Sequence, residues 1–258
     1  MTNSTQSWSV IIFCYNEEGA LRSVIDAVQS FFETGRIIAG EIIIVDDGST
    51  DSCPEIVRKA AATYSNIKPI FHDRNLGIGR ALRSGYAAVQ NENVSAVPAD
   101  GQFNVMELLP YTNLPEKTFV SFYRKENTIY SVSRNILSYF NRKLNAAGLG
   151  LSQRDVNWVK IYKRSELGKL DLKTTSSLVE SEICAKLMLR HNTMIEAESV
   201  YLPRRAGQSR GASLPIVLRA ALETLRLLYV VSAYRIKLPK QASNHRMAVS
   251  PSESKGHP

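Results

Sequence analysis

The sequence predicts an α/β fold in which a mostly parallel sheet carries helices on both faces and an amphipathic helix follows at the C-terminus. Four short apolar runs occur within the first hundred residues, and each is typical of a buried parallel strand. The first three are each followed by a segment with apolar residues at helical spacing, and this alternation favours a parallel sheet. A polar turn closes each run, so the turns are expected to meet at the sheet edge where ligands bind in open α/β folds.

The composition fits one large α/β domain, or one domain with an appendage, since 44% of the 258 residues are apolar and 22% are charged. The three cysteines, Cys14, Cys53 and Cys184, lack metal-ligand spacing, and such a sparse, odd set favours a reducing compartment over a disulfide framework. Residues 1–7 lack the basic and apolar regions of a signal peptide, and no run of about 18 uncharged apolar residues is present. We therefore expect a cytoplasmic protein without a transmembrane helix.

The net charge of +8 is concentrated in the last fifth of the chain. Residues 203–258 hold ten of the 32 Lys and Arg residues and two of the 24 Asp and Glu residues, which leaves 22 of each sign elsewhere. A basic tail suits an anionic lipid surface, nucleic acid or simple solubility. The rest of the chain has no zinc-finger or RNP-type signature, so a nucleic-acid partner is not expected.

The first apolar run, residues 8–13, predicts a strand that leads through Asn16 into a helix over residues 17–32. Asn16 is expected to cap this helix, with Glu17 and Glu18 in its first turn. The turn lacks the G-x-G-x-x-G pattern, which argues against a Rossmann dinucleotide site.

The second apolar run ends in two adjacent acids, Asp46 and Asp47, which a glycine and two hydroxyl residues follow. One hypothesis is that Ser49 or Thr50 caps the next helix, over residues 51–64. Capping does not explain the two acids, which are able to accept hydrogen bonds from ribose hydroxyls or from a base.

The third run is followed by a glycine-rich turn that opens a helix at about residues 79–90. Backbone N–H groups and the helix dipole at such a turn attract phosphate. Arg80 and Arg83 are candidates for charge-assisted bonds to that phosphate.

The fourth run, residues 94–98, leads to Asp100, Gly101 and Gln102. Gly101 frees the backbone to turn sharply, which places the side chains of Asp100 and Gln102 near one point. Two oxygen ligands on such a turn suit Mg²⁺ or Mn²⁺ carried by a diphosphate. The alternative is an Asx-type turn without a ligand.

Four strand-end segments carry a family resemblance: VIIFCYNE at 10–17, VDDGSTD at 45–51, NLGIGRAL at 75–82 and ADGQ at 99–102. In this order and spacing they resemble the family-2 glycosyltransferases, which have the GT-A fold, a Rossmann-like α/β fold. The branch most similar to this chain is that of the dolichol- and polyprenyl-phosphate sugar transferases. The resemblance covers roughly residues 8–210.

This resemblance implies that the first two turns hold the base and ribose of a nucleotide-sugar donor, and the third turn is assigned to the donor as well. The expected donor-binding residues are Tyr15, Glu17, Asp46, Asp47, Asn75, Gly77 and Arg80. The fourth turn would hold Mg²⁺ or Mn²⁺ and the diphosphate through Asp100 and Gln102. Pro98 stands where the family has the first aspartate of its D-x-D motif, so binding without turnover is an alternative.

Later segments resemble the family's acceptor and phosphate sites. With Asp100, the expected catalytic residues are Arg124 after a strand at 118–122, Arg134 on a helix over 131–146, Asp155 before a further strand, and Arg205 and Ser209 in a P-x-R-x-x-G-x-S loop. Arg204 replaces Arg205 if the register slips by one residue. The alternatives are a solvated helix face for Arg134, a basic solvent loop for residues 203–210, and an ion pair with Arg154 for Asp155.

Residues 213–234, SLPIVLRAALETLRLLYVVSAY, predict an amphipathic helix whose narrow polar stripe is Arg219, Glu223 and Arg226. Three charges would cost roughly 2.5–3.5 kcal/mol each in a bilayer core, so the helix is not expected to span a membrane. Basic residues at its end favour an anionic membrane interface, and packing on the body or on a partner is the alternative.

We therefore expect a GT-A domain at residues 8–210, a helix within 211–238 that binds a membrane surface, and a disordered tail at 239–258. The expected reaction is inverting transfer of a sugar from a nucleotide sugar to a polyprenyl phosphate at the cytoplasmic face of the membrane. A phosphate acceptor is already an anion and needs no general base. If the acceptor is instead a sugar hydroxyl of a glycan, Asp155 is the candidate base.

Overall fold

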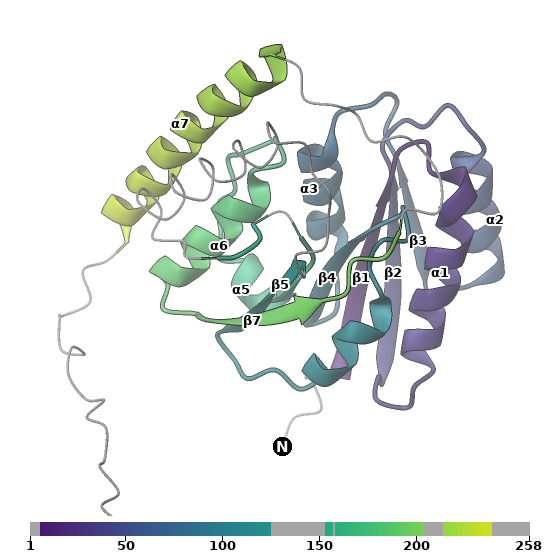
Figure 1. The fold of residues 1–258 in the computed structure, drawn as a ribbon. Coiled ribbons are helices and arrows are strands. Elements are labelled where there is room, and N and C mark those ends of the chain that lie inside the picture. The colour runs from purple at the N-terminus through teal and green to yellow at the C-terminus, as the bar shows by residue number, and fades with distance from the viewer. Residues whose placement is uncertain (1–5, 125–152, 157, 204–213, 239–258) are drawn as a thin grey trace, which may run out of the picture.

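The computed structural model describes residues 6–124, 153–156, 158–203 and 214–238, and a seven-stranded sheet forms its centre (Figure 1). The strand order is β3-β2-β1-β4-β6-β5-β7. The strands are β1 Ser7–Cys14, β2 Ala39–Asp46, β3 Ile67–Phe71, β4 Asn93–Pro98, β5 Thr118–Arg124, β6 Lys160–Lys163 and β7 Thr193–Ser199. Strand β6 runs antiparallel to its neighbours β4 and β5, whereas the other pairs are parallel. The predicted mostly parallel sheet is therefore confirmed.

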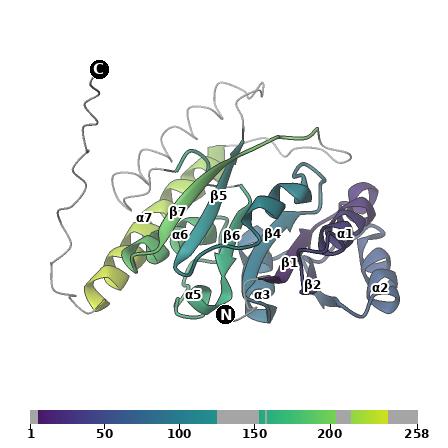
Figure 2. The same cartoon turned by 90° about the horizontal axis from the view of Figure 1, so that it is seen from below.

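Helices cover both faces of this sheet, as Figures 1 and 2 show. One face carries α1 Glu18–Phe32, α2 Cys53–Thr63 and the 3₁₀ helix η2 Val105–Tyr111. The other carries α3 Ile78–Ala88, α6 Val179–Leu189 and α7 Leu214–Lys237, and the one-turn helix α5 Arg164–Leu167 follows β6. The two sets of helices produce two hydrophobic cores with the sheet between them.

The isoleucines of β1 and β2 supply both cores because successive side chains of a strand point to opposite faces. Ile12 and Ile44 are register partners and lie in the core beneath α1 and α2. Ile11 and Ile43 are register partners one residue earlier and lie in the core beneath α3 and α6. A continuous apolar run is thus what a strand with both faces covered requires.

Helix α7 packs beside α6 through one side and leaves another side in solvent (Figure 2). Leu227 and Val231 are buried against the body. The exposed side carries four large apolar residues, Leu222, Leu225, Tyr229 and Ile236. None of the helices in the described part of the chain combines the length and apolar character needed to span a bilayer.

The topology brings several chain segments to one edge of the sheet. Strands β1, β2 and β4 are parallel and end there. Strand β6 is antiparallel to β4, so its first residue, Lys160, lies at this same edge.

Candidate active site

A cavity of about 980 Å³ opens at this edge of the sheet. Five of the expected donor-binding residues line it together with the metal candidates and one arginine: Tyr15, Glu17, Asp47, Asn75, Gly77, Asp100, Gln102 and Arg124. The lining also includes residues that the sequence did not single out for the donor: Trp158, Lys160, Ser177, Glu180 and Tyr201. Asp46 and Arg80 are not part of this lining, although both were expected to bind the donor.

The prediction that Asn16 caps α1 is wrong. Asn16 has a φ of 55°, and its side-chain oxygen accepts the N–H of Thr50 in the neighbouring loop at 2.8 Å. The Asn16 N–H in turn donates to Ser49 Oγ at 3.0 Å. The first turn of α1 is served by Asp51, whose carboxylate accepts the N–H of Glu18 at 3.0 Å. The two loops that flank the cavity are thus joined into one unit.

The hydroxyl residues of the β2–α2 loop do not cap α2 either. The N-cap position is Ser52, whose side chain makes no capping bond, and the Asp51 carboxylate accepts the N–H of Cys53 at 3.0 Å instead. Asp46 is 2% exposed and accepts the N–H of Ser49 at 3.1 Å. Asp46 therefore stabilises the turn from a buried position.

Cys14 lies at the end of β1 and is one of the residues that line the cavity, with its side chain packed in the core beneath α1 and α2. Its Sγ lies 3.6 Å from the carbonyl oxygen of Val45. A hydrogen bond with Cys53, together with burial, raises the pKa of the Cys14 thiol. The Cys14 thiol therefore stays protonated within the core.

Asp47 joins the second strand-end loop to the third. Its carboxylate accepts hydrogen bonds from His72 Nδ1 at 2.7 Å, from the N–H of Leu76 at 3.0 Å and from the N–H of Gly77 at 2.8 Å. Gly77 has a φ of 89°, a conformation that favours glycine. The N–H groups that we expected to bind a donor phosphate therefore bind a carboxylate of the protein itself, and Asp47 holds this part of the wall in place.

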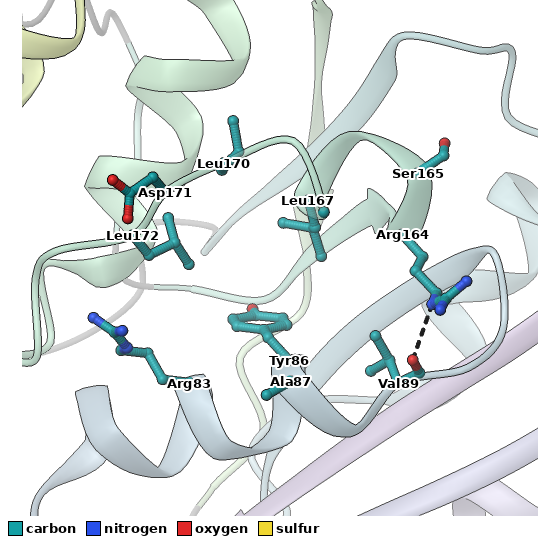
Figure 3. Close-up of a pocket in the computed structure, with 11 residues that line it drawn as sticks. Arg83, Tyr86, Ala87, Val89, Arg164, Ser165, Leu167, Leu170, Asp171 and Leu172 are labelled. Atoms are coloured by element: carbon teal, nitrogen blue, oxygen red, sulfur yellow. Dashed lines mark hydrogen bonds between the residues drawn. The ribbon is translucent and has the colours of Figure 1, made fainter.

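The two arginines that follow this turn lie outside the cavity lining. Arg80 is exposed to solvent. Arg83 donates to the carbonyl oxygen of Thr174 at 3.2 Å and lines a second hollow of about 640 Å³. Figure 3 shows Arg83 and Arg164 at opposite ends of that hollow, with the ring of Tyr86 between them. Arg83 is therefore not part of the cavity that contains Asp100.

The loop of the metal candidates is linked to the segment before residue 203. Gly101 has a φ of 73°, and Asp100 Oδ1 accepts the N–H of Gln102 at 3.0 Å, so the expected sharp turn is present. The Gln102 side chain donates to the Tyr201 hydroxyl at 2.6 Å, and the Gln102 carbonyl accepts the N–H of Leu202 at 3.0 Å. The chain that leads towards the predicted P-x-R-x-x-G-x-S loop thus passes beside Asp100.

Arg124, the last residue of β5, is the centre of a cluster that lines another part of the cavity. Its guanidinium donates to both oxygens of Asp155, from Nε at 2.6 Å and from Nη2 at 3.2 Å. The same group lies 4.9 Å from the ring centroid of Trp158 and 5.5 Å from that of Tyr201, both within cation–π range. Asp155 thus pairs with Arg124 in two bonds, and the expected partner, Arg154, pairs with Glu196 at 3.9 Å.

Two buried charged residues of the cavity wall were missed in the sequence. Lys160 begins β6 and donates to the carbonyl oxygens of Val156 and Trp158 at 2.8 and 2.9 Å. Glu180 lies in the first turn of α6, and a tyrosine hydroxyl donates to each of its oxygens. The available signal was a pair of carboxylates, Glu180 and Glu182, in a segment that is otherwise largely apolar, because a charge inside a buried helix is uncommon without a partner or a function.

Three of the expected catalytic residues, Arg134, Arg205 and Ser209, lie outside the described residues. Their assignments remain predictions from the sequence.

A family model described as glycosyl transferase family 2 matches residues 9–165, more than half of the chain. A dolichyl-phosphate beta-glucosyltransferase of Trichomonas vaginalis is 33% identical over 108 residues, which are 38% of this chain and 33% of the relative. An undecaprenyl-phosphate 4-deoxy-4-formamido-L-arabinose transferase of Salmonella paratyphi B is 36% identical over 104 residues, 40% of this chain and 31% of the relative. The glycosyltransferase YibD of Escherichia coli K12 is 27% identical over 197 residues, 71% of this chain and 56% of the relative. The matches thus span from about a third to just over half of these relatives.

Solved structures with the same fold include two enzymes that act on phosphoglycerate compounds. Glucosyl-3-phosphoglycerate synthase of Mycobacterium tuberculosis, solved with Mn²⁺, UDP-glucose and phosphoglyceric acid, has a TM-score of 0.64 at 17% identity over 87% of this chain and 80% of its own. Mannosyl-3-phosphoglycerate synthase of Rubrobacter xylanophilus has a TM-score of 0.66 at 16% identity over 94% of this chain and 79% of its own. These likenesses confirm the predicted GT-A fold.

Proposed function

Because the chain belongs to glycosyl transferase family 2, we propose that it transfers a sugar from a nucleotide-sugar donor to a polyprenyl phosphate, with inversion at the anomeric carbon. The observation that carries this proposal is a single cavity lined by the donor loops, the Asp100 turn and Arg124. A direct, in-line displacement needs the donor and the acceptor in one such space.

The donor nucleotide is assigned to the side of the cavity formed by β1 and β2. Tyr15 and Glu17 come from the loop after β1, and Asp47, Asn75 and Gly77 come from the two following turns. The hydrogen bonds between these loops support the assignment because they fix the wall before a ligand arrives. Asp46 and Arg80 would then affect donor binding only indirectly, by stabilising the turns in which they lie.

The donor diphosphate and a divalent cation, Mg²⁺ or Mn²⁺, are assigned to the turn at Asp100. Asp100 supplies a carboxylate, and Gln102, whose amide nitrogen binds Tyr201, offers its amide oxygen. Within the described ranges no group of three or more His, Cys, Asp or Glu side chains is placed to hold a metal, which suits an ion that takes most of its ligands from phosphate and water. When bound, such an ion neutralises charge that develops on the leaving diphosphate.

The acceptor phosphate is assigned to the Arg124 side. A guanidinium held by Asp155 and by two aromatic rings has few rotamers left to lose when it binds an anion. Asp155 is engaged in two bonds to Arg124, which favours an acceptor that does not need a base. From the sequence, Arg134, Arg205 and Ser209 are further candidates for holding the phosphates.

A membrane surface is the proposed partner because polyprenyl acceptors reside in bilayers. The exposed side of α7 carries Leu222, Leu225 and Tyr229 beside Arg226, and Arg235 and Lys237 lie in its last turn. Apolar and basic residues on one exposed helix suit the interface of an anionic bilayer.

The test is a transfer assay with UDP- and GDP-sugars, each with Mg²⁺ or Mn²⁺, against a short-chain polyprenyl phosphate and an oligosaccharide. We expect a glycosyl phosphate lipid from one donor class, detected by mass spectrometry. Arg205→Ala should then reduce kcat/KM about 30- to 1000-fold, since one charge-assisted pair is worth roughly 2–4 kcal/mol in the transition state. Product on the oligosaccharide alone would instead identify transfer to a sugar hydroxyl, and donor binding with no transfer would identify a binding protein.

A further inference from the structure

Glu180 is a buried carboxylate in the cavity wall that the proposed donor, metal and acceptor sites do not use. It lies in the first turn of α6 and is 8% exposed. The Tyr86 hydroxyl donates to its Oε1 and the Tyr162 hydroxyl to its Oε2, each at 2.5 Å. These tyrosines come from α3 and β6, so three elements hold the carboxylate in one orientation.

The surroundings hold the Glu180 carboxylate in a fixed position. Lys160 Nζ lies 3.9 Å from Glu180 Oε2, with the Lys160 side chain 1% exposed. Burial raises the pKa of Tyr86 and Tyr162 well above its usual value, so both hydroxyls stay protonated and donate. A carboxylate has about four lone-pair sites, and the two tyrosines occupy two of them. The carboxylate therefore retains capacity to accept hydrogen bonds from a group in the cavity.

The strand order indicates which part of the donor reaches this wall. Asp47 follows β2, Tyr15 follows β1, Asp100 follows β4 and Lys160 begins β6, and these four strands are adjacent in that order. A donor whose nucleoside lies at β2 and β1, with its diphosphate at Asp100, therefore extends its sugar over β6. Glu180 is in contact with β6 through Tyr162.

We propose that Glu180 binds hydroxyl groups of the transferred sugar and makes the enzyme selective for a pyranose that carries them; this inference rests on the proposed function. A carboxylate disfavours phosphate but accepts hydrogen bonds from neutral hydroxyls, and its two oxygens suit two neighbouring hydroxyls of one ring. Tyr86 and Tyr162 are positioning residues that act through Glu180. The ring of Tyr86 also lines the second hollow, seen in Figure 3, so this residue links α3 to the sugar site.

The test compares ligands with and without the sugar by calorimetry in Mn²⁺. The probes are UDP, GDP, UDP-glucose, GDP-mannose and monodeoxy analogues of the two sugars. We expect Glu180→Gln to bind the free nucleoside diphosphate within about twofold of the wild type, to bind the nucleotide sugar about tenfold or more weakly, and to lose the wild type's preference over one deoxy analogue. A site that hydrogen-bonds a substrate hydroxyl rejects the analogue without it strongly, so the wild-type preference in kcat/KM should exceed about 100-fold.

Two further sets of variants separate recognition from folding. Tyr86→Phe and Tyr162→Phe should reduce the same preference without changing affinity for the free diphosphate. Glu41→Gln is the matched control, because Glu41 is also buried and hydrogen-bonded but lies at the opposite end of β2. It should lower the melting temperature and leave sugar selectivity unchanged.

Three results would overturn the inference. An equal loss of affinity for the free diphosphate in Glu180→Gln would place the residue in nucleotide binding or folding. Unchanged sugar affinity and selectivity with lost transfer would place it on the acceptor side. If the wild type binds none of the nucleotide sugars, the proposed function itself fails, and the inference fails with it.

Discussion

Arg124 and Asp155 form a two-bond ion pair across 31 residues of sequence, with Nε 2.6 Å from Oδ2 and Nη2 3.2 Å from Oδ1. The pair joins the end of β5 to the segment before β6, beside Trp158 and Tyr201. Arg124 thereby reaches the cavity with a fixed orientation. Asp155 serves as its counterion, so the two residues have to be tested together.

Under the lipid-phosphate proposal, Arg124→Ala should lower kcat/KM by about 30- to 1000-fold, because a charge-assisted contact to phosphate is lost. Asp155→Asn should lower it less than about tenfold, since no proton has to be removed from the acceptor. Steady-state kinetics with a short-chain polyprenyl phosphate would measure both, and the double variant should resemble Arg124→Ala alone.

Arg154→Gln is the matched control, because this neighbouring arginine is 64% exposed and pairs with Glu196 instead. It should stay within about twofold of the wild type. If Asp155→Asn were to lose about 10²–10⁴-fold while Arg124→Ala stayed active, Asp155 would be a general base and the acceptor a hydroxyl.

The sequence predicted most of the sheet edge but not the contacts between its loops. The strand ends at Cys14, Asp46 and Pro98 follow short, largely apolar runs, and a local pattern suffices to find them. Asn16 looked like a helix cap because the residues around it allow one. Its actual partners lie more than 30 residues away in Ser49 and Thr50, and local spacing does not report such pairs.

Glu180, the α6 residue that lines the cavity, was missed for the same physical reason. Glu180 is stabilised by Tyr86 and Tyr162, which lie 94 and 18 residues away and on different elements. Arg80 and Arg83 are residues that the sequence suggested for phosphate binding but that do not line the cavity. Both follow a glycine-rich turn and lie on α3. The Arg83 side chain donates to the carbonyl oxygen of Thr174, and the Arg80 side chain is exposed to solvent.

Asp100→Asn should abolish metal-dependent transfer, with a loss of at least about 100-fold, while the melting temperature stays within a few degrees. Calorimetry of nucleoside diphosphate binding should show weaker affinity in Mn²⁺ and no difference in EDTA. Asp73→Asn is the control, because Asp73 is an exposed aspartate in the loop after β3, and this variant should behave as the wild type. Unchanged Mn²⁺ dependence in Asp100→Asn would refute the metal assignment.

Asp47→Asn should weaken nucleotide binding and also lower stability. The amide has one acceptor oxygen, whereas the carboxylate now serves His72 and the N–H groups of Leu76 and Gly77. Loss of one hydrogen bond to a charged group costs about 1.5–3 kcal/mol. Thermal unfolding and calorimetry would report the two effects, and a nucleotide affinity equal to that of the wild type would argue against a donor-side role.

Glu182 should make folding stability depend on pH in the acidic range. Burial alone raises the pKa of its carboxyl, but the Lys186 ammonium and the N–H groups of Lys173 and Thr174 outweigh burial and hold that pKa below 4.5. A lowered pKa in the folded state means that the stabilisation is complete above the unfolded value and is lost as pH falls through the folded value.

Glu182→Gln should therefore cost roughly 3–5 kcal/mol near pH 7, because Lys186 is left as a buried charge without its carboxylate partner. The difference from the wild type in free energy of unfolding should shrink as pH falls below about 4.5. Urea unfolding at several pH values measures this difference. Glu55→Gln, at an exposed glutamate of α2, should show no such change, and a pH-independent deficit in Glu182→Gln would contradict the assignment.

The exposed side of α7 provides the test of membrane binding. Deleting the helix would also remove Leu227 and Val231 from the core, so a deletion would confuse lipid binding with folding. Substituting Leu222, Leu225 and Tyr229 with Ser instead changes side chains that are 68%, 63% and 75% exposed. If each contributes roughly 1 kcal/mol or more of apolar burial in a bilayer, the triple variant should bind anionic vesicles on the order of 100-fold more weakly.

Sedimentation with phosphatidylglycerol vesicles would measure that binding, and the melting temperature should stay near that of the wild type. Activity on a long-chain polyprenyl phosphate in vesicles should fall with binding, whereas activity on a soluble short-chain acceptor should not, because the cavity is untouched. Ile38→Ser is the matched control, since Ile38 is 62% exposed and immediately precedes β2, which is next to the edge strand β3. Vesicle binding of the triple variant equal to that of the wild type would exclude this side of α7 as the membrane contact.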